Sequence, residues 1–104
     1  MIVYIAGPMK GKKNMNRPAF YEAQDALEDH GYLVLNPAKL PVGMDEKAYM
    51  PICLHMIEKA DVVAMMNGWK DSAGARLERA YAEYQGKRIV TVEWLLGKDA
   101  EAWD

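Results

Sequence analysis

Apolar positions along this chain follow two patterns: short continuous runs, and stretches in which apolar residues recur at helical spacing. Four continuous runs predict buried parallel strands, at 2–6, 32–35, 61–66 and 89–92. Three amphipathic stretches predict helices, at 18–30, from about 45 onward, and at 73–85. Strands that alternate with helices in this way indicate an α/β domain with a parallel sheet.

Glycine and proline residues divide these runs and so predict where the elements end. Gly7-Pro8 ends the first run, and a glycine follows the first and the third helix as a C-terminal stop. Pro51 has no N–H group and therefore predicts a start or a kink of the second helix near that residue. After the fourth run, 94–97 fit a short helical turn, and the polar stretch 99–104 is expected to fray.

The connections between the strands predict the architecture. Right-handed crossovers favour a flavodoxin-like three-layer sandwich with a four- to five-stranded parallel sheet in the order 2-1-3-4. In this order the first and third strands are neighbours. The loops that leave their carboxyl ends, at Gly7 and at 68–74, should then wall one crevice, which is where open α/β sheets bind ligands.

Composition narrows the class of protein and of ligand. The 104 residues predict one domain, 1–104, with 51% hydrophobic and 27% charged residues, as in soluble globular proteins. No apolar run approaches membrane-spanning length. A net charge of -2 supplies no basic field for a nucleic-acid polymer, so we expect a small-molecule ligand. A single cysteine, Cys53, and a strand-like start in place of a signal sequence lead us to expect a cytoplasmic protein.

The segment 68–78 carries the densest group of candidate functional residues, at the junction of the third strand and the third helix. Ser72 is a natural N-cap, and its hydroxyl and the N–H groups of Ala73 and Gly74 could equally hold a phosphate. Glu78 is placed in the opening turn, where the helix dipole is expected to keep its carboxylate ionised at neutral pH. The carboxylate is then a potential nucleophile, and simple complementation of the dipole is an equal alternative.

The helical wheel of the third helix predicts which side chains surround this carboxylate. Gly74 and Ala75 share a face with Glu78 and leave little bulk above it, so a ligand could approach closely. The packing face is expected to consist of Leu77, Ala80, Tyr81 and Tyr84.

Three further residues near the two loops have two interpretations each. Tyr4 is expected to pack in the core by default, but its phenol could donate a hydrogen bond that orients Glu78. Trp69 offers a flat face for a base, although a loop tryptophan more often packs against its neighbours. Asp71 can cap the helix or bind a sugar hydroxyl.

Four basic residues lie in the loop after the first strand or at its end: Lys10, Lys12, Lys13 and Arg17. They could clamp a phosphate, although most such charges are merely solvated. His30 and His55 pair with no acid or cysteine at metal-ligand spacing, and we expect neither a metal nor an organic cofactor. The eight methionines are expected to fill the core or to line a subunit surface.

Five motifs occur in order along the chain: VYIAGP at 3–8, NRPAF at 16–20, LNP at 35–37, ADVV at 60–63 and GWKDSAG at 68–74. Together they resemble the nucleoside 2-deoxyribosyltransferase superfamily, and most closely its small DUF4406 branch. The resemblance extends up to Glu93, and the Gly-x-x-x-Glu step that ends at Glu78 is its most specific part. It implies a single nucleoside 2-deoxyribosyltransferase-like domain.

The resemblance implies a covalent mechanism. In that superfamily the glutamate matching Glu78 attacks the anomeric carbon of a 2-deoxynucleoside, releases the base, and forms a glycosyl ester that water or another base resolves. Tyr4 matches the tyrosine that positions this nucleophile. Ser72 and Gly74 resemble positions that hold a 5′-phosphate, which favours a nucleoside monophosphate. The candidate substrate-binding residues are Gly7, Lys10, Arg17, Trp69, Asp71, Ser72 and Gly74.

Cys53 departs from the superfamily's pattern, because transferases carry at this position an acid that protonates or holds the base. A thiol is a poor general acid, and Asp45, Glu46 or Asp71 could replace it. Two other hypotheses therefore stand beside the enzyme: a nucleotide-binding protein that has lost turnover, and a purely structural or interaction domain. A homo-oligomer, a dimer or larger, is also expected, since small members of the superfamily complete their sites across subunits.

Overall fold

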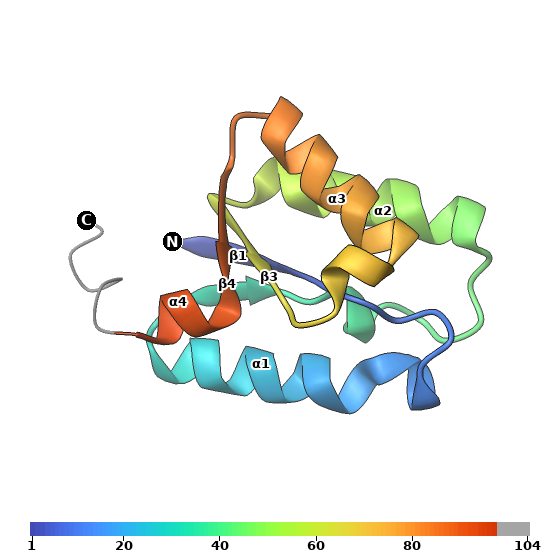
Figure 1. Cartoon of the computed structure of the whole chain (residues 1–104), viewed down its shortest axis with the longest axis horizontal. Coiled ribbons are helices and arrows are strands. Elements are labelled where there is room, and N and C mark those ends of the chain that lie inside the picture. Colours follow the sequence, from blue (N-terminus) through green and yellow to red (C-terminus); the bar gives the residue numbers. More distant parts are fainter. Residues whose placement is uncertain (98–104) are drawn as a thin grey trace.

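A four-stranded parallel sheet forms the centre of the protein, whose computed structural model describes residues 1–97 (Figure 1). Its strands are β1 (Ile2–Ala6), β2 (Leu33–Leu35), β3 (Val62–Met65) and β4 (Arg88–Thr91). The strand order is β2-β1-β3-β4 and every pairing is parallel, which confirms the predicted order 2-1-3-4.

Helices cover both faces of this sheet and complete the three layers. On one face lie α1 (Arg17–Asp29) and α4 (Val92–Leu96), and on the other lie α2 (Glu46–Lys59) and α3 (Ala73–Tyr84) (Figure 1). Three short 3₁₀ turns, η1 to η3, lie in the connecting loops at Lys13–Asn16, Pro37–Lys39 and Trp69–Asp71.

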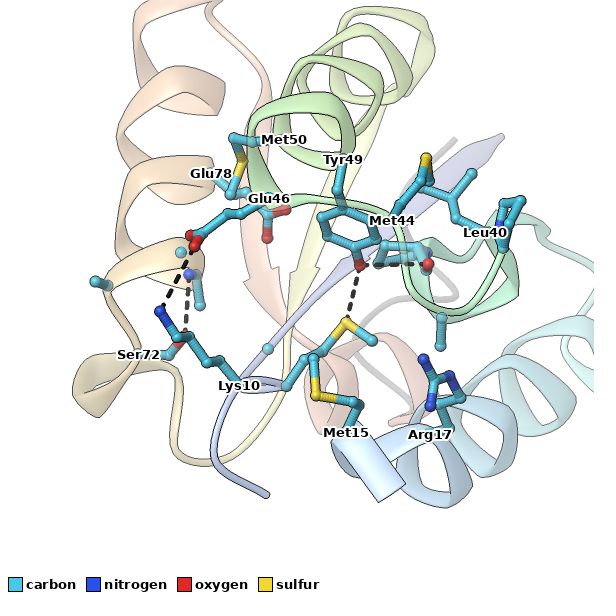
Figure 2. Close-up of a pocket in the computed structure, with 18 of the residues that line it drawn as sticks. Lys10, Met15, Arg17, Leu40, Met44, Glu46, Tyr49, Met50, Ser72 and Glu78 are labelled. Atoms are coloured by element: carbon cyan, nitrogen blue, oxygen red, sulfur yellow. Dashed lines mark hydrogen bonds and ion pairs between the residues drawn. The ribbon is translucent and has the colours of Figure 1, made fainter. Parts of the chain in front are cut away.

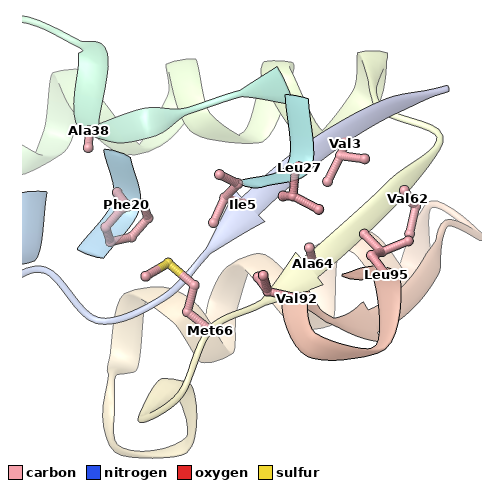
Figure 3. Packing of buried hydrophobic residues seen from close by; sticks show 10 residues of the cluster. All are labelled: Val3, Ile5, Phe20, Leu27, Ala38, Val62, Ala64, Met66, Val92 and Leu95. Carbon is pink, nitrogen blue, oxygen red and sulfur yellow. The ribbon is translucent and has the colours of Figure 1, made fainter. Parts of the chain in front are cut away.

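Side chains of β1 alternate between two hydrophobic cores because successive residues of a strand point to opposite faces of the sheet. Val3 and Ile5 join the core under α1 and α4, together with Phe20 and Leu27 (Figure 3). Tyr4 and Ala6 join the second core, under α2 and α3, together with Cys53, Ile57, Val63 and Ala82. Because β1 pairs with β2 and with β3, Tyr4 lies in the middle of the sheet.

The second helix starts before Pro51, so the proline does not mark its beginning. Helix α2 begins at Glu46, and the side chain of Asp45 caps it by accepting a hydrogen bond from the Lys47 N–H (3.2 Å). Pro51 lies inside this helix at an exposed position, where the pyrrolidine ring faces solvent and only one backbone hydrogen bond is forgone. A good N-cap and the buried face of α2 therefore outweigh the local preference of proline.

The packing face predicted for the third helix is wrong except at Tyr81, which is half-buried and packs against the second core. Leu77 is 49% exposed and Tyr84 is 86% exposed, whereas the buried residues of α3 are Ala75, Glu78 and Ala82. These three follow each other at helical spacing, and the two alanines let the helix approach the sheet closely. Consequently Glu78, and not a leucine, faces the protein interior. The predicted fraying at 99–104 lies outside the described residues.

Candidate active site

A cleft of about 470 Å³ opens at the carboxyl ends of β1 and β3, on the side of the sheet that α2 and α3 cover (Figure 2). Its size is within the range of about 300–1,000 Å³ usual for small-molecule sites. Seven of the nine candidate site residues line it: Gly7, Lys10, Arg17, Asp71, Ser72, Gly74 and Glu78.

Glu78 is the only carboxylate among residues 1–97 that is buried, with 5% of its surface exposed, yet it lines the cleft. Its Oε2 accepts a hydrogen bond of 2.6 Å from the hydroxyl of Tyr4, which is itself fully buried. Tyr4 belongs to the central strand and Glu78 to the helix packed on it, so both partners sit on rigid elements. The tyrosine therefore fixes the orientation of the carboxyl group.

Burial raises the pKa of Glu78 to about 7, although hydrogen bonds from Tyr4 and from the Cys53 thiol act in the opposite direction. The expectation that the helix dipole keeps this carboxylate ionised is therefore wrong in two respects. Glu78 is the sixth residue of α3 and lies beyond the first turn, where the dipole acts most strongly. Loss of hydration dominates instead, so the neutral form of the carboxyl group is populated near pH 7 beside the ionised form.

The two groups that contact Glu78 keep their own protons. Burial, followed by the charge of Glu78, raises the pKa of Tyr4 well above its ordinary value. Burial likewise raises the pKa of the Cys53 thiol to about 11. Both groups are therefore hydrogen-bond donors to the carboxyl group at neutral pH, and neither is a ready source of a proton for a leaving group.

The N-terminus of α3 lies less than two helical turns from this carboxyl group. Ser72 is the N-cap, and its Oγ accepts a hydrogen bond from the Ala75 N–H (3.2 Å). The N–H groups of Ala73 and Gly74 precede the first backbone donor of the helix, the N–H of Arg76, which bonds to Ser72 O (2.9 Å), and both residues line the cleft. A side chain at Gly74 would approach Met50, whose Cε is 3.5 Å from the Cβ position. This helix start is suited to an anion.

The glycine at the end of β1 has a packing role as well as a place in the cleft. A Cβ atom on Gly7 would lie 2.8 Å from Cβ of Met66, closer than such atoms approach. Glycine at this position therefore lets the first loop cross directly over the end of β3.

The basic residues of the first loop differ in whether they line the cleft. Lys10 lines the cleft and forms an exposed ion pair with Glu46 (3.6 Å), while Lys12 and Lys13 are exposed and do not line it. Arg17, the first residue of α1, lines the cleft at the end opposite Ser72, with the Tyr49 ring between them (Figure 2).

Trp69 is placed away from the cleft. Its indole packs against the second core and has the cations of Lys70 and Arg79 within 5.8 Å and 5.2 Å of a ring centroid. The ring is therefore occupied by protein contacts. Among the acids considered as replacements at the Cys53 position, Glu46 and Asp71 line the cleft, whereas Asp45 caps α2.

Sequence reasoning missed the apolar wall of the cleft. Four of the methionines line it, at positions 9, 15, 44 and 50, together with Leu40 and Tyr49. The Tyr49 hydroxyl lies 2.9 Å from Met9 Sδ and 3.3 Å from Pro37 O, which positions its ring across the cleft. Two of these methionines follow β1 and two lie around the start of α2, and their number in the sequence was interpreted as core filling or a subunit surface. Thioether side chains are polarisable and suit contact with an aromatic ring.

No three His, Cys, Asp or Glu side chains of residues 1–97 gather closely enough to hold a metal ion. Within the same range, no helix combines the length and the apolar character that crossing a membrane requires.

A family model described as a domain of unknown function, DUF4406, matches residues 1–91. The chain belongs to the DUF4406 family. No curated protein matches it in sequence. The DUF4406 domain shares its α/β fold with nucleoside 2-deoxyribosyltransferases of known structure, which confirms the resemblance at the level of the fold.

Three solved structures illustrate this shared fold, and each aligns with 86% of the DUF4406 chain. A 2-deoxyribosyltransferase from Leishmania mexicana has a TM-score of 0.70 at 18% identity. A CMP N-glycosidase from Clostridium botulinum has 0.65 at 22%, and a 2-deoxyribosyltransferase from Bacillus psychrosaccharolyticus has 0.68 at 19%. The chain spans 62% of the Leishmania protein, 70% of the Clostridium protein and 71% of the Bacillus protein.

Proposed function

We propose that the protein cleaves the N-glycosidic bond of a deoxynucleoside or deoxynucleoside monophosphate, or transfers its deoxyribosyl group, through a covalent intermediate on Glu78. One observation carries this proposal. A buried carboxyl group, held by Tyr4 at 2.6 Å, lines a nucleotide-sized cleft less than two helical turns from an N-terminus suited to an anion. The two kinds of activity named for proteins of the same fold, deoxyribosyl transfer and N-glycoside cleavage, agree with it.

In the first step the ionised Glu78 carboxylate attacks C1′ of the sugar. The C1′–N bond breaks, its electron pair leaves with the base, and an ester bond forms between C1′ and the carboxylate oxygen. The base takes a proton from water in the open mouth of the cleft or from Glu46 or Asp71, which line it. Cys53 is unsuited to this task because its thiol pKa is about 11.

In the second step water or a second base attacks C1′ from the face that the first base left. The ester bond breaks, Glu78 is released as a carboxylate, the proton of the attacking water or base N–H passes to solvent, and the sugar regains its original configuration after two displacements. Tyr4 stabilises the carboxylate as it is expelled, since its phenol remains a proton donor throughout.

A 5′-phosphate is the favoured substituent on the sugar. The free N–H groups of Ala73 and Gly74 and the Ser72 hydroxyl lie four to six residues before Glu78, roughly 6–9 Å along the helix axis. That separation suits a nucleotide, in which three bonds separate C1′ from C5′ around the ring and the phosphate lies beyond. The helix dipole adds to binding of the anion.

Incubation with each deoxynucleoside monophosphate, followed by chromatography of the free base, tests the proposal. Glu78→Gln preserves the hydrogen-bonding shape but not the nucleophile, and we expect base release to fall by about 10³-fold or more. Glu83→Gln is the matched control, because Glu83 lies on the exposed side of the same helix. Base release that is equal in Glu78→Gln and wild type would remove Glu78 from the mechanism.

A nucleotide-binding protein without turnover is the second candidate, and the buried Cys53 thiol favours it. Where transferases carry an acid, this chain has a group that does not give up its proton near neutral pH. Tight binding of nucleotides without any release of base would support this alternative in the same set of experiments.

A further inference from the structure

The cation of Arg17 lies at the cleft with few partners of its own. Within residues 1–97, its guanidinium makes one hydrogen bond, from Nη1 to Asn14 O at a long 3.4 Å, and no ion pair. Its Nε is buried and has no acceptor. A buried donor without an acceptor costs free energy, which a ligand that supplies an acceptor would recover.

Local backbone structure fixes the position of residue 17 at the cleft. Three consecutive residues before α1 have positive φ, namely Asn14 (53°), Met15 (54°) and Asn16 (59°). The Asn16 side chain also donates to Pro8 O (2.8 Å) and ties the segment to the first loop. Such a left-handed stretch is unfavourable for residues other than glycine and persists only when its surroundings enforce it. It delivers Arg17 to the cleft as the first residue of α1.

The position of Arg17 separates it from the end of the cleft assigned to phosphate. Ser72 and Glu78 lie at one end, the Tyr49 ring lies between, and Arg17 lies at the other end (Figure 2). With the phosphate at α3 and C1′ at Glu78, the base extends toward Tyr49 and Arg17. The methionines and Leu40 supply apolar contact there, so a planar ring finds its faces covered and its edge toward Arg17.

We propose that Arg17 selects the base by donating from Nε and Nη2 to two adjacent acceptors on its edge, an inference that rests on the proposed nucleotide site. Side-on guanidinium contacts of this kind require two acceptors next to each other. The edges that match are O6 with N7 of a 6-oxopurine and O2 with N3 of cytosine. Adenine, uracil and thymine offer an acceptor next to a donor on the corresponding edges. The partly exposed side chain turns both nitrogens toward the ligand by rotation of its terminal torsions.

Nucleotide binding to the Glu78→Gln protein by calorimetry tests this selection without turnover. The panel is dGMP, dIMP and dCMP, against dAMP, dUMP and TMP, with deoxyribose 5-phosphate as the ligand that lacks a base. We expect the first group to bind more tightly by about 10-fold or more, and Arg17→Gln to remove that difference. Binding of deoxyribose 5-phosphate should not change. Lys12→Gln, an equal loss of charge at an exposed position outside the cleft, should alter neither.

Two results would overturn the inference. One is equal binding of both groups by the Glu78→Gln protein with Arg17 intact. The other is an Arg17→Gln variant that weakens deoxyribose 5-phosphate as much as it weakens the nucleotides, which would make Arg17 a phosphate ligand. The outcomes for the two proposals remain distinct. Selective binding without base release by the wild-type protein leaves the role of Arg17 standing and removes the proposed reaction, whereas base release without selection does the reverse.

Discussion

Each face of the sheet carries a hydrophobic core, but the two cores bury different kinds of side chain. Under α1 and α4 the core consists of apolar side chains, among them Val3, Ile5 and Leu27. Under α2 and α3, apolar packing surrounds a connected polar group made of Tyr4, Glu78 and the Cys53 thiol. A single strand serves both, since Val3 and Ile5 point one way and Tyr4 points the other.

The difference shows how a small domain can place a reactive group without losing its core. A buried carboxyl group is costly when it is ionised, but Tyr4 and Cys53 supply donors and the proton can also stay on Glu78. The apolar face bears no such cost and holds the sheet rigid. We therefore expect substitutions on the two faces to separate stability from chemistry.

Leu27→Ala should have the largest effect on stability. Leu27 is fully buried in the apolar core, and its truncation is expected to lower the free energy of unfolding by about 2–5 kcal/mol. Urea denaturation measures this loss. Base release by the folded fraction, and its dependence on pH, should remain as in wild type. A shifted pH dependence in Leu27→Ala would show that the two faces are coupled.

Stability should depend on pH through Glu78. Its pKa of about 7 in the folded protein lies above the ordinary 4.5, so the folded state binds more protons between pH 4.5 and 7. The free energy of unfolding contributed by this group is fully present below pH 4.5 and declines as pH rises to 7, by about 3 kcal/mol.

Denaturant titrations of wild type and Glu78→Gln across this pH window measure the effect. The glutamine variant cannot titrate, and the difference between the two proteins cancels contributions from other acids. Wild type should lose stability relative to Glu78→Gln as pH rises. A constant difference would contradict the burial of a titrating carboxyl group on this face.

Tyr4→Phe should have a smaller effect, and mainly on chemistry. Removing the hydroxyl deletes a hydrogen bond that favours the ionised carboxylate, so the pKa of Glu78 should rise further. The rise of kcat/KM with pH should then move to higher pH, and its value at pH 7 should fall by about 10- to 100-fold. Ala6→Gly on the same strand face serves as a comparison. An unshifted profile in Tyr4→Phe would mean that Tyr4 only packs.

Much of the fold could be predicted from the local pattern of apolar residues, glycine and proline. Continuous apolar runs bounded by glycine or proline identify buried parallel strands, and handedness then leaves few possible orders of four strands. The convergence of Gly7 with 68–74 followed from that order. The motifs led us to expect that Tyr4 positions the Glu78 carboxyl group, and the Tyr4 hydroxyl donates a hydrogen bond of 2.6 Å to it.

The remaining features depend on tertiary packing, which local pattern does not contain. The ionisation of Glu78 was misjudged because the dipole of its helix can be inferred from sequence, whereas its burial arises only when α2 and α3 close over the sheet. The orientation of Trp69 toward Arg79, and the position of Tyr49 across the cleft, depend likewise on neighbours distant in sequence. The loop between β2 and α2 has the length typical of a binding element, but it has no periodicity that would show which of its side chains face the cleft.

Trapping the covalent intermediate tests the central claim most directly. Wild-type protein mixed with a deoxynucleoside monophosphate, quenched in acid within the first turnovers and digested, should yield a peptide containing Glu78 that carries the mass of a deoxyribosyl phosphate. The same peptide from Glu78→Gln should be unmodified. Rapid base release by wild type with no modified peptide, or with the sugar attached to another residue, would contradict the assignment of Glu78 as the nucleophile.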